Sequence, residues 1–252
     1  MLDSLGSRGD QPAWGNKGEI RWRAADSCAA GDAEHTVLNA GETKLFAAPP
    51  FGGRTKRGLD LFLALLLLPI AAIVALPVAV LIALEGGKPI YGHLRVGWNG
   101  RLFRCYKFRT MVTDADVALR TLLQQDPEAR LQWLERHKLE NDPRVTRLGW
   151  LLRETNLDEI PQIWNVLRGE MSWVGPRPVV KEELSRYGAH LPAYLACRPG
   201  ITGLWQVSRR SDTPYSKRVT LDQDYARNWS VARDLTILFR TIPRILSLNG
   251  RP

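Results

Sequence analysis

The longest apolar stretch of the chain runs from Leu61 to Leu84 and contains no charged residue. About 20 apolar residues are enough to cross the hydrocarbon of a bilayer, so the pattern predicts a membrane helix over residues 54–86 rather than the core helix of a soluble domain. Pro69 and Pro77 interrupt the run, and each removes a helical hydrogen bond and favours a bend. Positive charge marks the cytoplasmic side of a membrane helix, and here basic residues flank both ends. A helix that breaks near Pro69 and returns to the same face satisfies both flanks, so we expect a re-entrant helix.

Shorter blocks of apolar and polar positions follow. Residues 87–111 combine short aromatic and apolar runs with glycine turns, which predicts a hairpin or two short strands. Leucines at helical spacing predict a helix over about 115–139, and apolar positions at i, i+3, i+4 and i+7 predict another over 157–167. Residues 235–246 fit a helix in the membrane interface and a core helix ending at Pro243 equally well. The fold class is therefore a small mixed α/β domain over residues 87–252, with amphipathic helices and one membrane helix.

Composition separates residues 1–53 from the rest of the chain. This segment is rich in Gly, Ala, Asp and Ser, and it lacks the apolar stretch of a secretory signal, so it predicts a flexible N-terminal arm. The whole chain carries a formal charge of +9 and a pI near 9.8. Such a balance favours an anionic partner, which is a nucleic acid, an acidic membrane surface or a phosphorylated substrate. Zinc spacing and aromatic RNA-binding motifs are absent from the sequence, which argues against nucleic acid.

Cysteines and histidines do not form a metal-binding pattern. Cys28, Cys105 and Cys197 are odd in number and far apart, which argues against a disulfide framework and favours a reducing compartment. The four histidines form no paired metal spacing. If a metal is used, carboxylate ligands and a hard cation such as Mg²⁺ are the expectation.

Residues 153–169 are the most informative segment for chemistry. Asp158 and Glu159 stand side by side at the predicted start of a helix, with Arg153 just ahead. One carboxylate could attack phosphorus while the other holds a cation that bridges phosphate oxygens. The alternative is structural, because Asn156 and Glu159 have the spacing of a helix capping box.

Three further segments place cationic side chains on stiff backbone or next to an aromatic residue. Arg177 lies between two prolines, which suits a guanidinium that must meet a phosphate rigidly. Arg198 stands beside a proline–glycine turn that leads to Gln206, and Lys107 and Arg109 enclose a phenylalanine. Each segment alone is a weak signal.

Together and in this order, the segments resemble those of the bacterial sugar transferases, the monotopic polyprenyl-phosphate phosphoglycosyl transferases. The resemblance covers about residues 54–246 and rests on KFRTM, DPRVTRLG, LDEIPQIWNVLRGEMSWVGPRP and RPGITGLWQV. It implies a re-entrant membrane helix hinged at Pro69 and a small cytosolic catalytic domain. With no further membrane helix ahead of Leu59, the expectation is the minimal form of the family.

The resemblance also implies roles for individual residues. Asp158 would attack the β-phosphorus of a UDP-sugar and release UMP, and the phosphate of a polyprenyl carrier would then displace the phosphosugar. Glu159 would help to hold Mg²⁺, Arg177 would bind phosphate and Arg153 would position the acidic pair. Weaker expectations for residues that line the site are Lys107, Arg109, Arg198 and Gln206, and Asp222 is expected to assist with the metal or the nucleotide.

The expected location is the cytoplasmic face of the bacterial inner membrane, where the product would initiate assembly of an exopolysaccharide, capsule or O-antigen. A homodimer is compatible with this expectation. Two alternatives remain open at the level of sequence. One is a membrane-anchored scaffold whose basic face holds anionic lipid without turnover, and the other is an altered enzyme that hydrolyses the nucleotide sugar.

Overall fold

The computed structural model describes residues 49–246, apart from 137–138, 140–141 and 210–212. Nearly all of the predicted arm over 1–53, including Cys28, therefore lies outside the described residues. The elements in chain order are α1 (Gly53–Leu84), β1 (Ile90–Val96), η1 (Trp98–Gly100), β2 (Leu102–Phe108), α2 (Ala115–Gln125), α3 (Pro127–Arg136), α4 (Arg147–Glu154), η2 (Leu157–Glu159), α5 (Gln162–Arg168), β3 (Ser172–Val174), η3 (Lys181–His190), α6 (Leu191–Leu195), β4 (Gly200–Thr202), α7 (Leu204–Ser208), α8 (Tyr215–Arg227) and α9 (Val231–Leu246).

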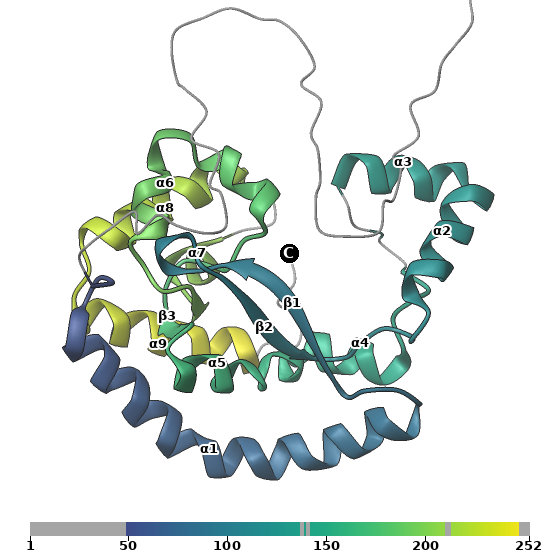
Figure 1. Ribbon diagram of the computed structural model, residues 1–252, viewed down its shortest axis with the longest axis horizontal. Helices are drawn as coiled ribbons and strands as arrows, with labels where there is room; N and C mark the ends of the chain where they lie inside the picture. Colours follow the sequence, from purple (N-terminus) through teal and green to yellow (C-terminus); the bar gives the residue numbers. More distant parts are fainter. Residues whose placement is uncertain (1–48, 137–138, 140–141, 210–212, 247–252) are drawn as a thin grey trace, which may run out of the picture. The chain divides into compact units, whose positions relative to one another are not determined.

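Helix α1 is the one described helix that is long and apolar enough to cross a membrane, as the sequence predicts. It stays helical through both Pro69 and Pro77, so the expected break at Pro69 is not seen. The helix instead follows a curved path beneath α5 and α4 (Figure 1). Most of its apolar side chains are exposed, with Ile73 at 73% and Leu76 at 70%. Such an apolar surface is suited to lipid rather than water.

The start of α1 is held by polar contacts with the rest of the domain. The Lys56 ammonium lies 2.5 Å from the carboxylate of Asp234 on α9, and both side chains are almost fully buried. Arg57 donates to the main-chain carbonyls of Val166 and Leu167 at 2.5 and 2.8 Å. One turn later, the Asp60 carboxylate accepts hydrogen bonds from Ser172 and from the main chain of Trp173.

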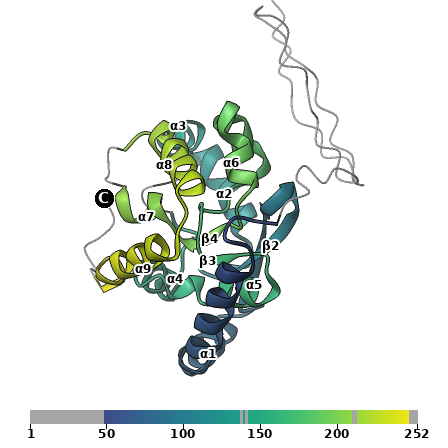
Figure 2. The same cartoon turned by 90° about the vertical axis from the view of Figure 1, so that its left-hand side faces the viewer.

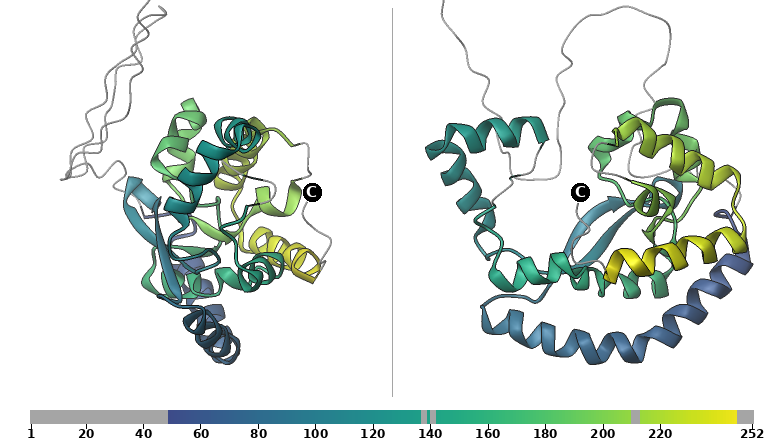
Figure 3. Two further views of the ribbon diagram at one scale, coloured as in Figure 1. Left: turned by 90° about the vertical axis from the view of Figure 1, so that its right-hand side faces the viewer. Right: turned by 180° about the vertical axis from the view of Figure 1, so that it is seen from behind.

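The end of α1 contacts the same domain. Val78 and Ile82 are buried in a cluster with Phe108 of β2 and Leu152 of α4. Arg109, just after β2, donates a hydrogen bond to the Ile82 carbonyl at 3.1 Å. The two ends of α1 are therefore fixed on one domain, and Figure 3 shows α4, α5 and α9 along the same side of that domain as α1.

The predicted hairpin is confirmed. Strands β1 and β2 pair antiparallel, with Tyr91 opposite Lys107 and His93 opposite Cys105. The turn contains Asn99 and Gly100, both with positive φ, 58° and 75°. An Asn–Gly pair suits this position because both residues adopt the left-handed conformation at low cost.

The prediction of a single helix over 115–139 is wrong in one respect, because the segment forms two helices, α2 and α3. Asp126, which precedes Pro127, is extended with φ −120° and ψ 104°. The ring of a proline disfavours helical geometry in the residue before it, so the helix ends there. The Asp126 carboxylate then caps the next helix by accepting hydrogen bonds from the amides of Glu128 and Ala129.

The segment predicted as a helix over 157–167 begins instead with the 3-10 turn η2, and α5 starts only at Gln162. Asn156 has a left-handed φ of 55° and its side chain makes no cap bond, so the alternative of a capping box is not supported. The Glu159 and Ile160 amides bond to carbonyls within the turn. These two N–H groups are therefore used within the turn itself.

The remaining core lies between the parallel pair β3–β4 and the C-terminal helices, which Figure 2 shows from the side. Tyr187, Tyr194 and Val219 pack together in one cluster, and Tyr225 and Ile237 pack in another. Helix α9 continues past Pro243 to Leu246, so it does not end at the proline. Its Ile237 is buried whereas Phe239 is 70% exposed, so one face of α9 packs in the core and another leaves apolar side chains exposed.

Candidate active site

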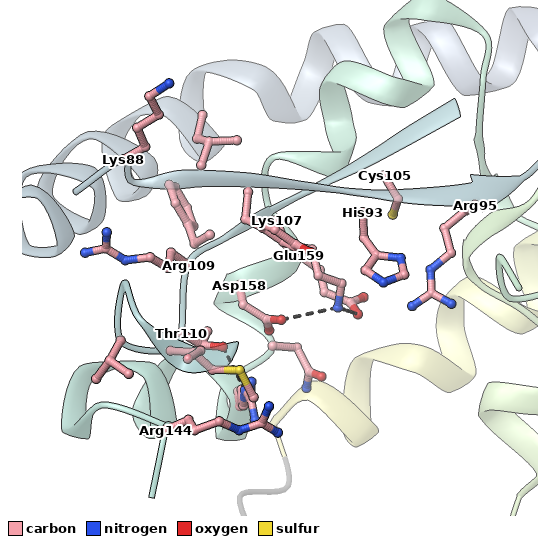
Figure 4. Close-up of a pocket in the computed structure, with 18 of the residues that line it drawn as sticks. Lys88, His93, Arg95, Cys105, Lys107, Arg109, Thr110, Arg144, Asp158 and Glu159 are labelled. Atoms are coloured by element: carbon pink, nitrogen blue, oxygen red, sulfur yellow. Dashed lines mark hydrogen bonds and ion pairs between the residues drawn. The ribbon is translucent and has the colours of Figure 1, made fainter. Parts of the chain in front are cut away.

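The hairpin presents one row of polar side chains to a cavity of about 900 Å³. Successive side chains of a strand alternate between its two faces, so residues two apart share a face. His93 and Arg95 of β1 and Cys105 and Lys107 of β2 are such pairs, and all four line the cavity. Figure 4 shows their side chains on the side of the hairpin that faces Asp158 and Glu159.

Lys107 joins the two predicted catalytic carboxylates. Its Nζ lies 3.3 Å from Oδ2 of Asp158 and 2.6 Å from Oε1 of Glu159 (Figure 4). Adjacent residues of the 3-10 turn η2 point about 120° apart, so the two carboxylates meet at the Lys107 ammonium group rather than lying side by side on one face. The Lys107 ammonium group holds the two negative carboxylates close together. The pair therefore forms a preorganised site for a single cationic or phosphorus centre.

Asp158 is largely withdrawn from water, with 8% of the residue exposed. Burial raises the pKa of its carboxyl group, and the neighbouring charge of Lys107 acts in the opposite direction. Lys107 thus favours the ionised carboxylate, the form that is nucleophilic.

Arg153 reaches the site because α4 packs closely on Thr110, in the segment that follows β2. Gly149 in the first turn of α4 lies so close to Thr110 that an added Cβ would be 2.0 Å from the Thr110 carbonyl oxygen. One turn later, Nε of Arg153 donates to the Thr110 hydroxyl at 2.8 Å. Arg153 lines the cavity beside the acidic pair, as the sequence predicts.

Arg177 lies on the loop after β3 and lines the same cavity. The loop is fixed by Arg218 of α8, which donates to the Arg177 carbonyl at 3.0 Å, and by the Gly200 amide, which donates to the Pro176 carbonyl at 2.8 Å. Arg95 lines the same cavity, and its pKa is lowered first by burial and then by the charge of Arg177. This concentration of cations suits a diphosphate.

Arg109 and Gln206 lie at the edges of the site. Arg109 lines the large cavity, but its guanidinium bonds to the carbonyls of Ile82 and Gly86 at the end of α1. Gln206 lines a second cavity, of about 440 Å³, which Glu159 and Arg177 also line.

Two predicted site residues lie elsewhere. Arg198 lines neither cavity, and its Nε donates to the Gly169 carbonyl at 2.9 Å. Asp222 is 1% exposed and accepts a 2.8 Å hydrogen bond from the hydroxyl of Tyr187. Asp222 therefore belongs to the core of the domain rather than to the group formed by Asp158 and Glu159.

Sequence analysis missed several residues that line the large cavity, among them His93, Arg95, Arg144 and Arg209. The alternation of side chains along β1 was a usable signal for the first two, because Lys107 was already a candidate on the paired strand. Burial and the charge of Arg95 lower the pKa of His93, which favours the neutral imidazole.

The acidic pair fits a divalent cation. Among the described residues, no three His, Cys, Asp or Glu side chains cluster as a complete metal site. Mg²⁺ commonly takes one or two carboxylates and completes its shell with water and substrate phosphates. Asp158 and Glu159 already share one cationic atom, the Lys107 Nζ, so a pair of carboxylates of this kind meets that requirement.

Comparisons with known proteins agree on one family. Residues 52–248 match the family model described as bacterial sugar transferase. A UDP-galactose-lipid carrier transferase of Erwinia amylovora is 49% identical over 195 residues, which are 77% of this chain and 41% of that protein. The exopolysaccharide production protein ExoY of Rhizobium meliloti is 46% identical over 208 residues, 81% of this chain and 91% of ExoY.

A UDP-glucose:undecaprenyl-phosphate glucose-1-phosphate transferase of Caulobacter vibrioides is 39% identical over 205 residues, 77% of this chain and 71% of that protein. The chain thus spans less than half the length of the Erwinia relative but most of ExoY. Since the family model covers most of the chain and all three relatives share more than 30% identity with it, the chain belongs to the bacterial sugar transferase family.

Proposed function

We propose that this protein transfers a sugar-1-phosphate from a UDP-sugar to a polyprenyl phosphate, releases UMP and forms the polyprenyl-diphospho-sugar that initiates a bacterial glycan. The observation that carries the proposal is the geometry of Asp158, Glu159 and Lys107 within a cation-lined cavity. The names of the Erwinia and Caulobacter relatives, which describe transfer to a lipid carrier and to undecaprenyl phosphate, support it.

The reaction divides into two displacements at one phosphorus atom. A carboxylate oxygen of Asp158 attacks the β-phosphorus, a new P–O bond forms, and the bond to the α-phosphate oxygen breaks so that UMP leaves with its electron pair. An oxygen of the polyprenyl phosphate then attacks the same phosphorus and displaces the carboxylate. Arg177 and Arg153 stabilise the charge on the phosphate oxygens in both steps.

We assign Mg²⁺ to the carboxylate of Glu159, and Asp158 keeps the role of nucleophile. When bound, the ion supplies charge neutralisation for the diphosphate of the donor. Lys107, which bonds to both carboxylates, keeps them oriented between turnovers.

We also propose that α1 is re-entrant and that the domain rests on the cytoplasmic face of the inner membrane. Support comes from Lys56 and Ile82, which lie near opposite ends of α1 and contact one domain. A helix that crossed about 30 Å of hydrocarbon would place one of these ends on the other side. Cysteines introduced as Arg54→Cys and Glu85→Cys, in a Cys28→Ser background, should react with an impermeant thiol reagent from the same side of the membrane. Reaction from opposite sides would establish a spanning helix.

The test of the activity is UMP release from a panel of UDP-sugars by detergent-solubilised protein with Mg²⁺, with and without undecaprenyl phosphate. We expect lipid-dependent turnover with one donor and, without lipid, one equivalent of UMP together with β-³²P label retained on the protein. Asp158→Asn should reduce transfer by at least about 10³-fold, as expected for loss of a nucleophile. Asp224→Asn, at the surface of α8, is the matched control.

Other outcomes point to other functions. Retained transfer by Asp158→Asn would exclude this residue as the nucleophile. Lipid-independent multiple turnover would identify a hydrolase, and absence of UMP from every donor with folded, lipid-supplied protein would favour a scaffold.

A further inference from the structure

The second cavity is an apolar groove that opens from the catalytic cavity onto the membrane helix. It encloses about 440 Å³, within the range of about 300–1,000 Å³ that is typical of ligand sites. Four residues line both cavities and define the junction between them: Asn156, Glu159, Arg177 and Arg209. A ligand at this junction can therefore have its polar end beside the acidic pair and its remainder in the groove.

One wall of the groove is a single face of α1. Leu67, Ile70, Ala71 and Val74 are spaced at i, i+3, i+4 and i+7, which places them on one side of the helix. This stretch includes Pro69, where the helix lacks a main-chain donor. The groove is thus bounded by the part of the chain that we assign to the hydrocarbon of the bilayer.

The facing walls come from the catalytic domain and are mainly apolar. They consist of Ile160, Ile163, Trp173, Ile201 and Val207. The hydroxyls of Thr202 and Thr241, which also line the groove, bond to one another at 2.8 Å. Because the Thr241 hydroxyl also donates to the Ile237 carbonyl at 2.8 Å, both hydroxyl hydrogens have acceptors, and this wall can accept hydrocarbon without leaving a buried hydroxyl unpaired.

The polar groups concentrate near the junction. Arg177 and Arg209 contribute charge there, and Arg244 is fixed beside them by hydrogen bonds to the carbonyls of Gln206 and Arg209 at 2.9 and 3.1 Å. Among the described residues, the buried Oε1 of Gln206 has no hydrogen-bond partner. Carboxamide oxygen and nitrogen exchange places when the group rotates, so this side chain can donate to a phosphate oxygen.

We propose that the groove holds the first isoprenyl units of the polyprenyl phosphate acceptor, with the phosphate at the junction beside Arg177 and Arg209. This inference rests on the proposed function and deepens it by assigning the acceptor site. The groove is too apolar for the uracil and ribose of a nucleotide, which need polar partners, whereas the larger cavity offers them. Donor and acceptor phosphates then use the same arginine in turn, because both cavities share Arg177.

Filling the groove from α1 tests the proposal. Ala71→Phe and Val74→Phe insert an aromatic ring into the groove, and Ala72→Phe is the matched control because Ala72 is exposed and lines neither cavity. Overpacking a site costs about 1–3 kcal/mol, so the KM for undecaprenyl phosphate should rise about ten-fold in both groove variants. The KM for the UDP-sugar and the single equivalent of UMP released without lipid should stay at the wild-type level. An unchanged lipid KM in both variants, with that UMP release intact, would overturn the proposal.

A binding experiment separates this inference from the proposed function. A farnesyl phosphate probe with a photoreactive diazirine should label the segments 67–74 and 201–207 of the wild-type protein, and excess polyprenyl phosphate should abolish the labelling. Labelling that only phosphatidylglycerol abolishes would assign the groove to bulk lipid and overturn the proposal, as would the absence of label from both segments. If the wild-type protein gives no lipid-dependent UMP but the label is displaced by polyprenyl phosphate, the transferase proposal fails and the acceptor site stands.

Discussion

The guanidinium of Arg218 donates a hydrogen bond to the main-chain carbonyl of Arg177, with 3.0 Å between Nη2 and the oxygen. Arg218 is buried and also lies 3.3 Å from the carboxylate of Glu183 and 3.7 Å from that of Asp222. It therefore connects the core of the domain with the loop that carries Arg177, which lines both cavities. Arg218 does not line either cavity, so its effect on the reaction must pass through the position of Arg177.

Arg218→Lys should lower kcat for transfer by about 10- to 100-fold, because small displacements of a positioning group are costly in a preorganised site. Arg227→Lys, on the exposed side of the same helix, should have no effect. The decisive comparison is a double-mutant cycle with Arg177→Ala. If Arg218 acts through Arg177, adding Arg218→Lys to Arg177→Ala should cause no further loss. Full additivity would show that the two residues act independently.

Lys107→Met should shift the acid limb of the pH–rate profile to higher pH. Burial already raises the pKa of Asp158, and Lys107 is the main influence that opposes this increase. Removing the cation raises the pKa further, so the nucleophilic carboxylate forms only at higher pH, and the rate should fall more at pH 6 than at pH 9. Lys88 lines the same cavity, but its side chain points away from Asp158 and Glu159 (Figure 4). Lys88→Met therefore removes an equal charge as a control, and its pH–rate profile should keep the acid limb of the wild type. A parallel loss at every pH in Lys107→Met would contradict this account.

Asp222→Asn should change how stability depends on pH. Burial raises the pKa of Asp222 from 3.8 to about 6, whereas the charge of Arg218 opposes the increase. Between about pH 4 and pH 6, the folded protein therefore holds a proton that the unfolded chain has lost, and stability falls as the pH rises through this window. A pKa shift of this size corresponds to a loss of roughly 3 kcal/mol in the free energy of unfolding. Asp222→Asn has no titrating group at this position, so its stability should not show this loss.

The difference in unfolding temperature between wild type and Asp222→Asn, measured in detergent from pH 4 to pH 7, checks this prediction. Asp224→Asn, on the same helix, supplies a control whose difference from wild type should stay constant across this pH range. The hydrogen bond from Arg233 lowers the pKa of Asp224, so its contribution should be present above pH 4 and lost as the pH falls. A pH-independent difference for Asp222→Asn would mean that this carboxyl group has an ordinary pKa.

Lys56→Met should destabilise the protein by about 3–5 kcal/mol, because it leaves the carboxylate of Asp234 buried without its cation. The double variant Lys56→Met, Asp234→Leu should recover part of this loss, since no unpaired charge then remains. Recovery should be incomplete because Tyr225 and Trp229 also donate to Asp234. Arg54→Met, an exposed neighbour on α1, serves as the control in thermal unfolding. Equal stability of Lys56→Met and the control would refute a structural role for the pair.

Much of the local structure follows from the sequence alone. The apolar run predicts α1, and the short apolar and aromatic runs with glycine turns predict the β1–β2 hairpin, because both depend on side chains close in sequence. The motif around Asp158 also identifies the acidic pair. The split at Pro127 was equally readable, since a proline restricts the residue before it whatever the tertiary context.

Only the tertiary structure decides which distant residues meet. Lys107 bonds to carboxylates 51 and 52 positions away, and Lys56 bonds to Asp234 across 178 positions. Periodicity reports how each element is buried but not which face of another element it meets. For this reason Asp222 and Arg198, both charged and both within recognisable motifs, lie outside the cavities, while the groove forms from α1 and four other parts of the chain. The sequence by itself determined α1, the β1–β2 hairpin and the acidic pair. The packing of the elements determined the site, because contacts between distant segments depend on the geometry of the whole domain.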